Sequence, residues 1–316
     1  SAARIETSKA WAKDVMQRAG VPTAAHHSFT DIAALRDHLL AGSGTVVVKA
    51  DGIAAGKGVL VSDDRTACVA FGEEYLRLGS SVLVEEQLRG PEVSLFALVC
   101  DDTVLPLACA RDYKRAHDGD AGPNTGGMGA ISPPDAPSDF LETMTDALIR
   151  PVAVEMVRSG SPFRGVLYAG LMLTEDGPKV LEFNARFGDP ETQVVLPRLR
   201  SDLLPLLADV ARGSLSATSV ELSASHACGV TIASAGYPST RAEPRACTVG
   251  PVPADAVVYH AGTSMGPDGQ LQAVGGRVFT AVGQGRTPAE ARRRAYELAD
   301  RVEFEGAWYR TDIGAS

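Results

Sequence analysis

Hydrophobic and polar side chains alternate along the segment V-L-E-F-N-A-R-F, from Val180 to Phe187. Successive side chains of a strand point to opposite faces, so this alternation predicts a β-strand with one apolar and one polar face. The apolar face would carry Leu181, Phe183, Ala185 and Phe187, and the polar face would carry Glu182, Asn184 and Arg186. Carboxylate and amide oxygens are ligands that Mg²⁺ prefers, and a fixed guanidinium suits a phosphate. The pattern alone is equally typical of an edge strand with one solvated face, so other segments must decide.

The periodicity elsewhere predicts a mixed α/β (α+β) protein. A helix is expected over Thr7 to Ala19, with Ser8 as its N-cap and Gly20 at its end. Strands are expected over 45–49, 58–61, 81–86, 92–99, 103–110, 165–174 and 179–187, and helices over 138–158, 202–211 and 288–300. We interpret these elements as a lead helix within residues 1–21, a small lid over 22–88, a core over 89–213 and a strand-rich C-terminal domain over 214–316.

The segment from Arg111 to Pro134 shows neither the helical nor the strand spacing of hydrophobic residues, and it is predicted to be one long irregular loop. It is too rich in Gly, Asn and Asp to pack as core, so its own hydrogen bonds or a ligand must hold it. Its cations and its amide, hydroxyl and glycine donors suit a carboxylate or a phosphate. These candidates are Lys114, Arg115, Asn124, Thr125, Gly126 and Gly127. The alternative is a disordered surface loop.

A glycine-rich tip joins two predicted strands in V-V-V-K-A-D-G-I-A-A-G-K-G-V-L-V. Lys49 ends the first strand, and Lys57 lies between Gly56 and Gly58. Glycine lets backbone N–H groups approach an anion closely, so the tip can fold over the phosphates of a nucleotide. The spacing differs from a Walker A loop, and a strand follows where that loop opens a helix. The alternative is an ordinary mobile surface hairpin.

Acidic residues end the next predicted strand, in V-L-V-E-E-Q-L-R-G-P-E. The chain passes here from the lid to the core, and domain crossings are favourable places for a ligand. Backbone groups near Glu85 could contact an adenine edge, and Glu92 could accept hydrogen bonds from ribose hydroxyls. Acidic residues at strand ends are more often simply solvated, so the segment is weak evidence by itself.

Composition sets limits on the class of protein. The chain has 316 residues, of which 45% are hydrophobic and 22% charged, which fits a globular protein of two or three domains. Apolar runs are too short to span a bilayer and the first twenty residues do not form a secretion signal, so we expect a cytoplasmic protein. A net charge of −9 argues against a nonspecific nucleic-acid binder. The five cysteines are scattered and odd in number, which favours reduced thiols.

Together these motifs resemble the glycinamide ribonucleotide synthetases (phosphoribosylamine-glycine ligases), a family of the ATP-grasp fold. The most specific motifs are G-P-N-T-G-G-M-G and E-F-N-A-R-F-G-D-P-E. The resemblance also includes S-K-A, K-A-D-G-I-A-A-G-K-G-V, D-Y-K-R, G-V-L-Y-A-G-L-M-L, Y-H-A-G-T, G-G-R-V and W-Y-R-T-D-I-G. It therefore covers essentially the whole chain.

The resemblance implies an ATP-dependent ligase. ATP would phosphorylate the carboxylate of glycine, and the amine of phosphoribosylamine would attack the acyl phosphate to form an amide. Carried over, Lys9, Lys49, Gly56, Lys57 and Gly58 would bind the ATP phosphates, Glu85, Glu86 and Leu88 would face adenine, and Glu92 would hold the ribose. Glu182 and Asn184 would bind Mg²⁺ (or Mn²⁺), Arg186 would steady the transferring phosphate, and Asp189 would face the amino acid.

The chain also departs from the family pattern. Members normally begin with a further domain of about a hundred residues, and this chain starts close to where that domain would end. Three explanations are open: the domain has been removed, another polypeptide supplies it, or the chain is a paralogue that couples a different amine in specialised metabolism. The expected partners are small-molecule substrates and either that separate polypeptide or further copies of the chain in a homo-oligomer. A non-catalytic ATP-binding module is a further alternative. A smaller departure is Ile131, where the family often has Tyr.

Overall fold

The computed structural model describes residues 2–52, 58–240 and 243–315. The chain forms two compact units. The first consists of Ser1–Leu107, Asp139–Arg186 and Leu204–Thr218, and the second of Ala108–Ser138, Phe187–Leu203 and Ser219–Ser316. The four-part division expected from the sequence stays a prediction.

The expected lead helix is confirmed as α2 (Lys9–Ala19), which follows the single turn α1 (Arg4–Thr7). Ser8 is the N-cap, because its hydroxyl accepts a hydrogen bond from the backbone N–H of Trp11 at 3.2 Å. Gly20 ends the helix in the left-handed conformation with φ of +68°, which glycine adopts without strain.

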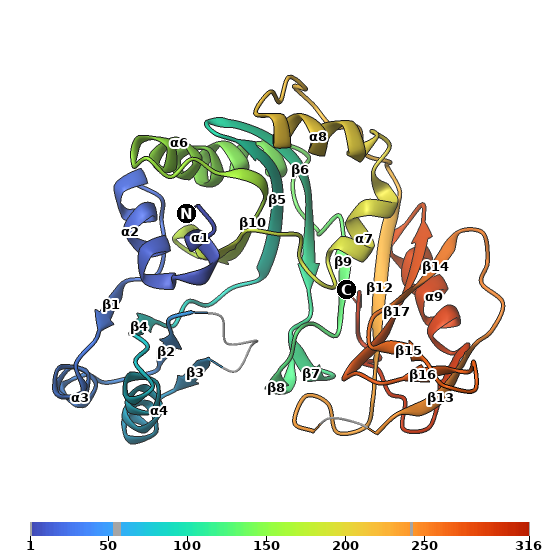
Figure 1. The fold of residues 1–316 in the computed structure, drawn as a ribbon, viewed down its shortest axis with the longest axis horizontal. Coiled ribbons are helices and arrows are strands. Elements are labelled where there is room, and N and C mark those ends of the chain that lie inside the picture. The colour runs from blue at the N-terminus through green and yellow to red at the C-terminus, as the bar shows by residue number, and fades with distance from the viewer. Residues whose placement is uncertain (1, 53–57, 241–242, 316) are drawn as a thin grey trace. The chain divides into compact units, whose positions relative to one another are not determined.

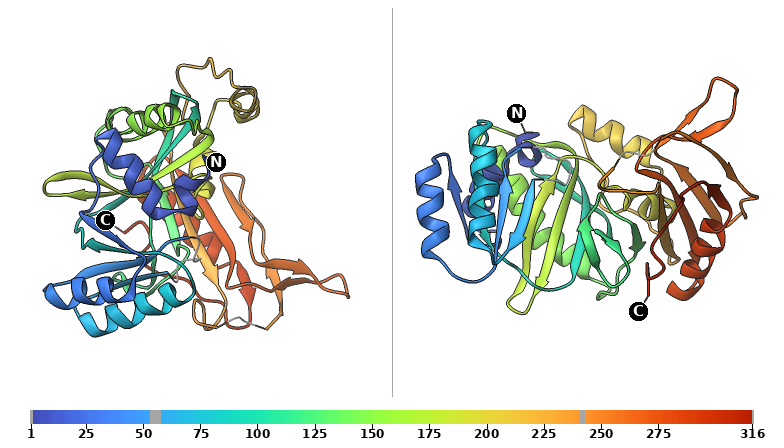
Figure 2. Two further views of the ribbon diagram at one scale, coloured as in Figure 1. Left: turned by 60° about the vertical axis from the view of Figure 1, so that its left-hand side comes forward. Right: turned by 90° about the horizontal axis from the view of Figure 1, so that it is seen from below.

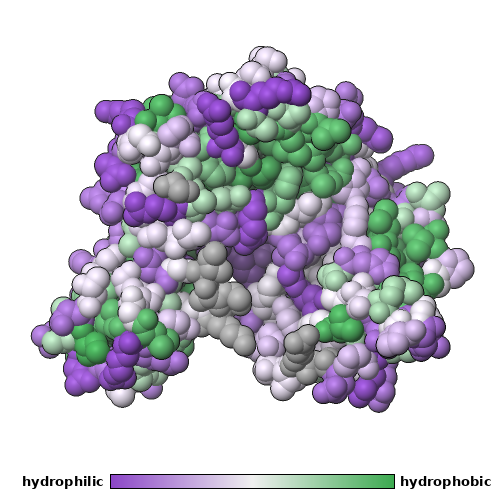
Figure 3. Space-filling view, in the orientation of Figure 1, coloured by the Kyte–Doolittle hydropathy of each residue, from purple (hydrophilic) through white to green (hydrophobic). Residues whose placement is uncertain are grey.

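A four-stranded antiparallel sheet lies next along the chain, in the order β1 (His26–Phe29), β4 (Val82–Glu86), β2 (Val46–Ala50), β3 (Val59–Ser62). Helices α3 (Ile32–Ala41) and α4 (Arg65–Arg77) lie side by side on one face of it (Figures 1 and 2). Their apolar sides meet the sheet in a core that includes Leu35, Leu39, Val48, Cys68 and Val82. Figure 3 shows apolar surface in the region of these helices. Leu40 of α3 and Leu78, the C-cap of α4, are among the exposed large hydrophobic residues of the described chain.

The rest of the first unit contains β5 (Glu92–Cys100), β10 (Arg164–Thr174) and β11 (Gly177–Asn184), with β10 paired antiparallel to both neighbours. The expected helix over 138–158 is present as α5 (Phe140–Met144), a π turn (Thr145–Ile149) and α6 (Arg150–Arg158). Helix α8 (Leu203–Arg212) is also as expected. Strand β6 (Thr103–Asp112) runs in sequence from the first unit into the second.

The expected strand over 179–187 is wrong at its C-terminal end. The ladder between β10 and β11 closes at the pair Tyr168–Asn184, and the backbone N–H of Ala185 donates to Glu6 Oε2 at 2.9 Å instead. A bulge between the pairs Gly170–Glu182 and Leu171–Val180 leaves Leu181 as the extra residue. The strict alternation is therefore broken. Arg186 lies beyond the strand, and its side chain reaches Asn184 from the segment that follows β11.

The second unit is built on antiparallel strands in the order β9 (Gly129–Ser132), β12 (His226–Ala233), β17 (Arg277–Gly285) and β14 (Ala256–His260), with the end of β6 paired to β9. Helix α9 (Pro288–Ala299) packs on this sheet, and their core includes Val230, Ile232, Phe279, Ala295 and Leu298. A smaller sheet has the order β15 (Thr263–Met265), β16 (Leu271–Ala273), β13 (Arg245–Val249), β18 (Val302–Phe304). Helix α7 (Thr192–Val195) continues into a 3₁₀ turn at Leu196–Arg198.

The expected long loop from Arg111 to Pro134 is also wrong. It contains a two-stranded ribbon, β7 (Arg115–His117) and β8 (Ala121–Asn124), followed by β9. Gly119 and Asp120 both have positive φ, +68° and +51°, which reverses the chain within a short turn. In the described part of the chain, no helix is both long enough and apolar enough to cross a bilayer.

Candidate functional site

In the first unit, Asp51 joins the amino end of α2 to the glycine-rich segment after β2. Its Oδ1 accepts hydrogen bonds from the backbone N–H groups of Lys9 and Ala10. Its Oδ2 accepts from the hydroxyls of Ser8 and Ser81 at 3.1 and 3.0 Å. A carboxylate is favourable at this end of a helix, where backbone N–H groups lack helical partners. Asp51 therefore fixes Lys9 against the base of the predicted phosphate loop.

The ammonium of Lys9 lies at this base. Its Nζ donates to the carbonyls of Ala50 and Gly52, at 3.0 and 2.7 Å. Burial lowers the pKa of Lys9, while the nearby carboxylate of Glu182 acts in the opposite direction. The structure thus brings the predicted phosphate-binding lysine close to the predicted metal ligand.

Glu85 bridges two lysines in the interior. Its Oε2 lies 2.8 Å from Lys49 Nζ and its Oε1 lies 3.2 Å from Lys13 Nζ. The side chains of Lys13 and Glu85 are each only 2% exposed. Lys13 Nζ also donates to Thr23 Oγ1 at 2.6 Å. Burial is the main cause that lowers the pKa of Lys13 to about 8, against the attraction of Glu85.

This arrangement adds a role to Glu85. Its carboxylate contacts two lysines and places the ammonium of Lys49, while the adenine contact expected through backbone groups of this segment stays a prediction. Sequence reasoning missed Lys13 altogether. A signal was present, because Lys13 lies on the buried side of α2 together with Ala12 and Met16. A lysine on the apolar face of a helix needs a buried partner.

The other candidate nucleotide residues of this unit lie along the chain from β3 to β5. The Glu86 carboxylate accepts from the backbone N–H of Ala25 at 3.0 Å and pairs with Lys179 at 3.1 Å, and these contacts lower its pKa. Leu88 is half-buried between β4 and β5, and Glu92 is half-buried at the start of β5. The carbonyl of Gly58 accepts from Ala50 N at 2.8 Å. Gly56 and Lys57 lie outside the described residues, and all these nucleotide contacts stay predictions.

The predicted metal ligands lie together at the end of β11. Asn184 Nδ2 is 3.4 Å from Glu182 Oε1, and Arg186 Nη2 is 3.4 Å from Asn184 Oδ1. Glu6 of α1 holds Arg186 through a contact of 2.9 Å to its Nε. Two adjacent oxygen-bearing side chains fit Mg²⁺, which takes few protein ligands and completes its shell with phosphate and water. Within the described ranges there is no group of three or more His, Cys, Asp or Glu side chains placed to hold a metal ion.

In the second unit, Asp189 and the turn at Gly126–Gly127 meet at Arg277. Arg277 Nη2 lies 2.6 Å from Asp189 Oδ2, and its Nη1 donates to the Gly126 carbonyl at 2.7 Å. The backbone N–H of Gly126 donates to Tyr237 Oη at 3.0 Å. Sequence reasoning missed Arg277, although it lies in the G-G-R-V motif, because nothing in the sequence indicates which segment it contacts.

The remaining candidate substrate residues lie on or beside the β7–β8 ribbon. Thr125 donates to the Lys114 carbonyl through both its N–H, at 2.7 Å, and its hydroxyl, at 2.8 Å. The Thr125 hydroxyl also accepts from Gly127 N at 2.9 Å. Arg115 pairs with Asn124 across the ribbon and donates to the carbonyl of Gly122 at 2.8 Å. These glycine and threonine donors therefore already have partners within the chain, and their role toward substrate stays a prediction.

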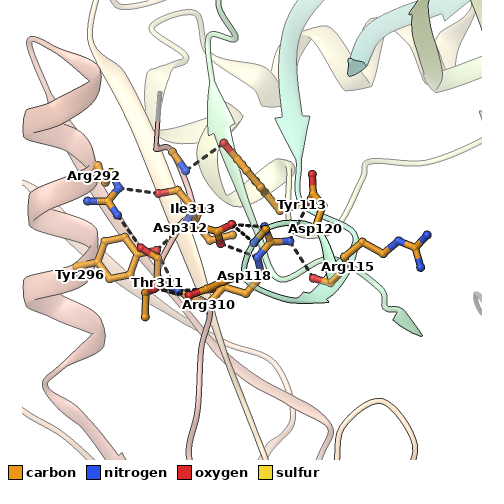
Figure 4. A network of polar contacts seen from close by, with 12 residues as sticks. Tyr113, Arg115, Asp118, Asp120, Arg292, Tyr296, Arg310, Thr311, Asp312 and Ile313 are labelled. Atoms are coloured by element: carbon orange, nitrogen blue, oxygen red, sulfur yellow. Dashed lines mark hydrogen bonds and ion pairs between the residues drawn. The ribbon is translucent and has the colours of Figure 1, made fainter. Parts of the chain in front are cut away.

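A buried arginine holds this ribbon to the C-terminal segment (Figure 4). The side chain of Arg310 is 1% exposed and binds Asp312 with two hydrogen bonds of 2.7 Å. It also reaches the ribbon, through Asp120 Oδ1 at 3.0 Å and the Arg115 carbonyl at 2.9 Å. On the other side, Arg292 of α9 donates to the carbonyl of Ile313 at 3.0 Å. The turn of the β7–β8 ribbon, which follows Lys114 and Arg115, is thus fixed by residues nearly two hundred positions later.

Comparison with solved structures shows the fold. The biotin carboxylase domain of the 2-oxoglutarate carboxylase of Hydrogenobacter thermophilus, in complex with MgADP, ADP and bicarbonate, matches with a TM-score of 0.73 and 16% identity. The match covers 96% of this chain and 67% of that chain, and at this identity it shows the fold alone. The fold is that of the ATP-grasp enzymes, and the matching family models and relatives make the chain an ATP-dependent ligase that forms a carbon–nitrogen bond.

Two family models identify the relationship more closely. Residues 7–192 match the phosphoribosylglycinamide synthetase ATP-grasp (A) domain, and residues 227–316 match the phosphoribosylglycinamide synthetase C domain. The chain belongs to the phosphoribosylglycinamide synthetase family. The resemblance seen in the sequence motifs is therefore confirmed.

Individual relatives agree with this assignment. The phosphoribosylamine–glycine ligase of Streptomyces coelicolor is 47% identical, over 99% of this chain and 76% of its own length. The enzyme of the same name from Caulobacter vibrioides is 44% identical, over 99% of this chain and 75% of its own length. The crystal structure of the Thermotoga maritima phosphoribosylamine–glycine ligase has a TM-score of 0.90 at 37% identity, and covers 99% of this chain and 80% of that chain.

Proposed function

We propose that the chain joins glycine to phosphoribosylamine in an amide bond and releases ADP and phosphate. The observation that carries this proposal is the adjacency of Glu182 and Asn184 beside Arg186 and Lys9, since two oxygen ligands with flanking cations suit a magnesium nucleotide. The substrates are those in the name of the relatives in Streptomyces coelicolor and Caulobacter vibrioides, which align with nearly the whole chain. A cytoplasmic location is part of the same proposal.

Residues of the first unit would bind and orient ATP. Lys9 and Lys49 would contact its phosphates, because their ammonium groups are already fixed by the carbonyls of Ala50 and Gly52 and by Glu85. Glu182 and Asn184 would hold Mg²⁺, which shields the phosphate oxygens when bound. Glu86, Leu88 and Glu92 would complete the nucleotide contacts.

Phosphoryl transfer then requires orientation rather than a covalent nucleophile. A carboxylate oxygen of glycine attacks the terminal phosphorus of ATP, and the bond to ADP breaks. Arg186, tethered by Glu6, would neutralise charge on the transferring group. The amine then attacks the acyl carbon and loses a proton as phosphate leaves. Holding the reactants in attack geometry and neutralising the developing charge together account for the acceleration in such reactions.

Residues of the second unit would bind the substrates. Asp189 would face the ammonium of glycine, and Lys114, Arg115 and the turn from Asn124 to Gly127 would supply positive charge and polar groups toward anionic parts of the substrates. A further polypeptide or a second copy of the chain as partner belongs to the proposal as well.

The test is substrate-dependent release of ADP. The chain is incubated with ATP, Mg²⁺, glycine and freshly formed phosphoribosylamine, and ADP and glycinamide ribonucleotide are measured. We expect both products together, and loss of both when either glycine or the amine is omitted. ADP release that ignores glycine, or nucleotide binding without product under any combination, contradicts the proposal.

A further inference from the structure

Arg277 is the point in the second unit where two motifs distant in sequence converge. Its backbone is fixed at the start of β17, where it pairs with Ala233 of β12 and its carbonyl accepts from Gly262 N at 3.0 Å. The side chain is 20% exposed. It reaches both the turn after β8 and the Asp189–Pro190 segment before α7.

The guanidinium contacts one carboxylate and three backbone carbonyls. Nη1 donates to the carbonyls of Gly126 at 2.7 Å, Asp189 at 3.0 Å and Gly127 at 3.4 Å. Nη2 donates to Asp189 Oδ2 at 2.6 Å. The planar fork of arginine can serve a carboxylate and carbonyls at once, whereas the compact ammonium of lysine cannot reach all of them.

The surrounding glycines make this approach possible. A Cβ at Gly126 would lie 2.9 Å from Arg277 Cζ, so a side chain there would displace the guanidinium. Gly127 has φ of +114°, and a Cβ there would lie 2.3 Å from Pro190 Cδ. The turn and the Asp189–Pro190 segment therefore touch on one side, and Arg277 ties them together on the other.

We propose that Arg277 is a positioning residue for the amino-acid end of the reaction, which acts by orienting Asp189 and the Gly126–Gly127 turn. This inference rests on the proposed function, because it assigns Asp189 to the glycine ammonium. A carboxylate offers about four lone-pair sites. Arg277 occupies one site on Oδ2 and Gln193 Nε2, at 2.8 Å, one on Oδ1, so acceptor sites for a substrate ammonium are left.

The contacts of Arg277 named above all belong to the second unit, whereas the candidate ATP residues Lys9, Lys49 and Glu182 belong to the first. Arg277→Met should therefore raise the KM for glycine without a matching rise in the KM for ATP. A misplacement of about 1 Å at a reacting group can cost a hundredfold, and we expect the KM for glycine to rise about tenfold or more.

The experiment compares Arg277→Met, Arg277→Lys and the matched control Arg293→Met. Arg293 is an exposed arginine of the same unit, paired with Glu297 on α9, and its removal changes net charge equally. KM and kcat are measured for glycine and for ATP, and thermal unfolding is recorded for each variant. Arg277→Lys should recover part of the glycine KM, and Arg293→Met should match the wild type.

A second variant separates positioning from folding. Asp189→Asn keeps the shape of a half-exposed side chain and loses the charge that Arg277 orients. If Arg277 acts through Asp189, adding Arg277→Met to Asp189→Asn should raise the KM for glycine by less than the product of the two single effects. Wild-type glycine KM in a folded Arg277→Met, or equal rises in the KM for glycine and for ATP, overturns the inference while the proposed function stands. Absence of glycine-dependent ADP release in the wild type overturns both.

Discussion

Replacing Lys13 by Met should change how stability depends on pH. Lys13 is 2% exposed, and burial lowers its pKa from 10.5 to about 8. In the unfolded chain the group titrates near its ordinary value, so between pH 8 and 10.5 the unfolded state holds a proton that the folded state has released. The free energy of unfolding therefore rises with pH across this window.

The size of the effect follows from the shift. One pKa unit corresponds to about 1.4 kcal/mol. Between pH 7.5 and 10 the free energy of unfolding of the wild type should therefore rise by roughly 2–3 kcal/mol relative to that of Lys13→Met. Below pH 8 Lys13 is charged in the folded and in the unfolded state, so folding of the wild type must remove an ammonium from water. Lys13→Met avoids this cost. Glu85 keeps Lys49 as its partner in the variant, at 2.8 Å in the wild type, so no buried carboxylate is left alone.

Urea unfolding of wild type and Lys13→Met at matched pH values measures this difference. Taking the difference between the two proteins cancels the titration of groups that both contain. We expect the urea midpoint of the wild type to rise steadily relative to that of Lys13→Met from pH 8 to 10. A difference in unfolding free energy that stays constant over this range would refute the buried, desolvated state of Lys13.

Three further outcomes test other parts of the structure. Glu182→Gln should lower turnover well over tenfold, because one lost charged ligand is commonly worth a few kcal/mol; unchanged turnover in steady-state assays would remove the proposed metal site. Gly90→Ala should destabilise the protein by about 3 kcal/mol or more, since φ is +149° and a Cβ would lie 2.0 Å from the Leu173 carbonyl oxygen. The control Gly79→Ala, at φ of +81° with no atom within 4 Å of its Cβ, should cost only about 1 kcal/mol in the same denaturation assay. Arg310→Met should cost roughly 3 kcal/mol, because it removes the hydrogen bonds of a buried guanidinium to Asp312, Asp120 and the Arg115 carbonyl, and hydrogen exchange at residues 115–124 should accelerate; wild-type protection there would contradict its role.

Local elements could be predicted from the sequence because their signals are local. Helix α2 combines a capping serine, a helical period and a terminal glycine, and the structure confirms all three. Strands β2, β3 and β4 of the first sheet lie within a residue or two of their expected bounds, whereas β1 of the same sheet was not among the expected strands. Adjacent polar residues at the end of β11 were also identifiable, because a strand alternates its faces.

The errors arose where a distant residue decides the local structure. Strand β11 ends at Asn184 because Glu6, on α1, captures the next backbone N–H. The β7–β8 ribbon depends on Arg310 and Asp312, which no pattern within residues 111–134 reveals. The lysine partners of Glu85, which come from α2 and β2, were likewise not evident from its own segment. Charged residues in a polar segment give no indication of which partner they meet.

The contacts of Arg310 also limit how members of this family can be recombined. The matched C-domain segment begins at residue 227, yet the acidic and carbonyl partners of Arg310 include Asp120 and Arg115, within the matched A-domain segment. A chimaera that joins the two segments from different relatives would place a desolvated guanidinium against a foreign turn. A chimaera should fold stably when its C-domain segment keeps Arg310 and its A-domain segment keeps the turn with Asp120. We expect no stable protein when either of these is replaced.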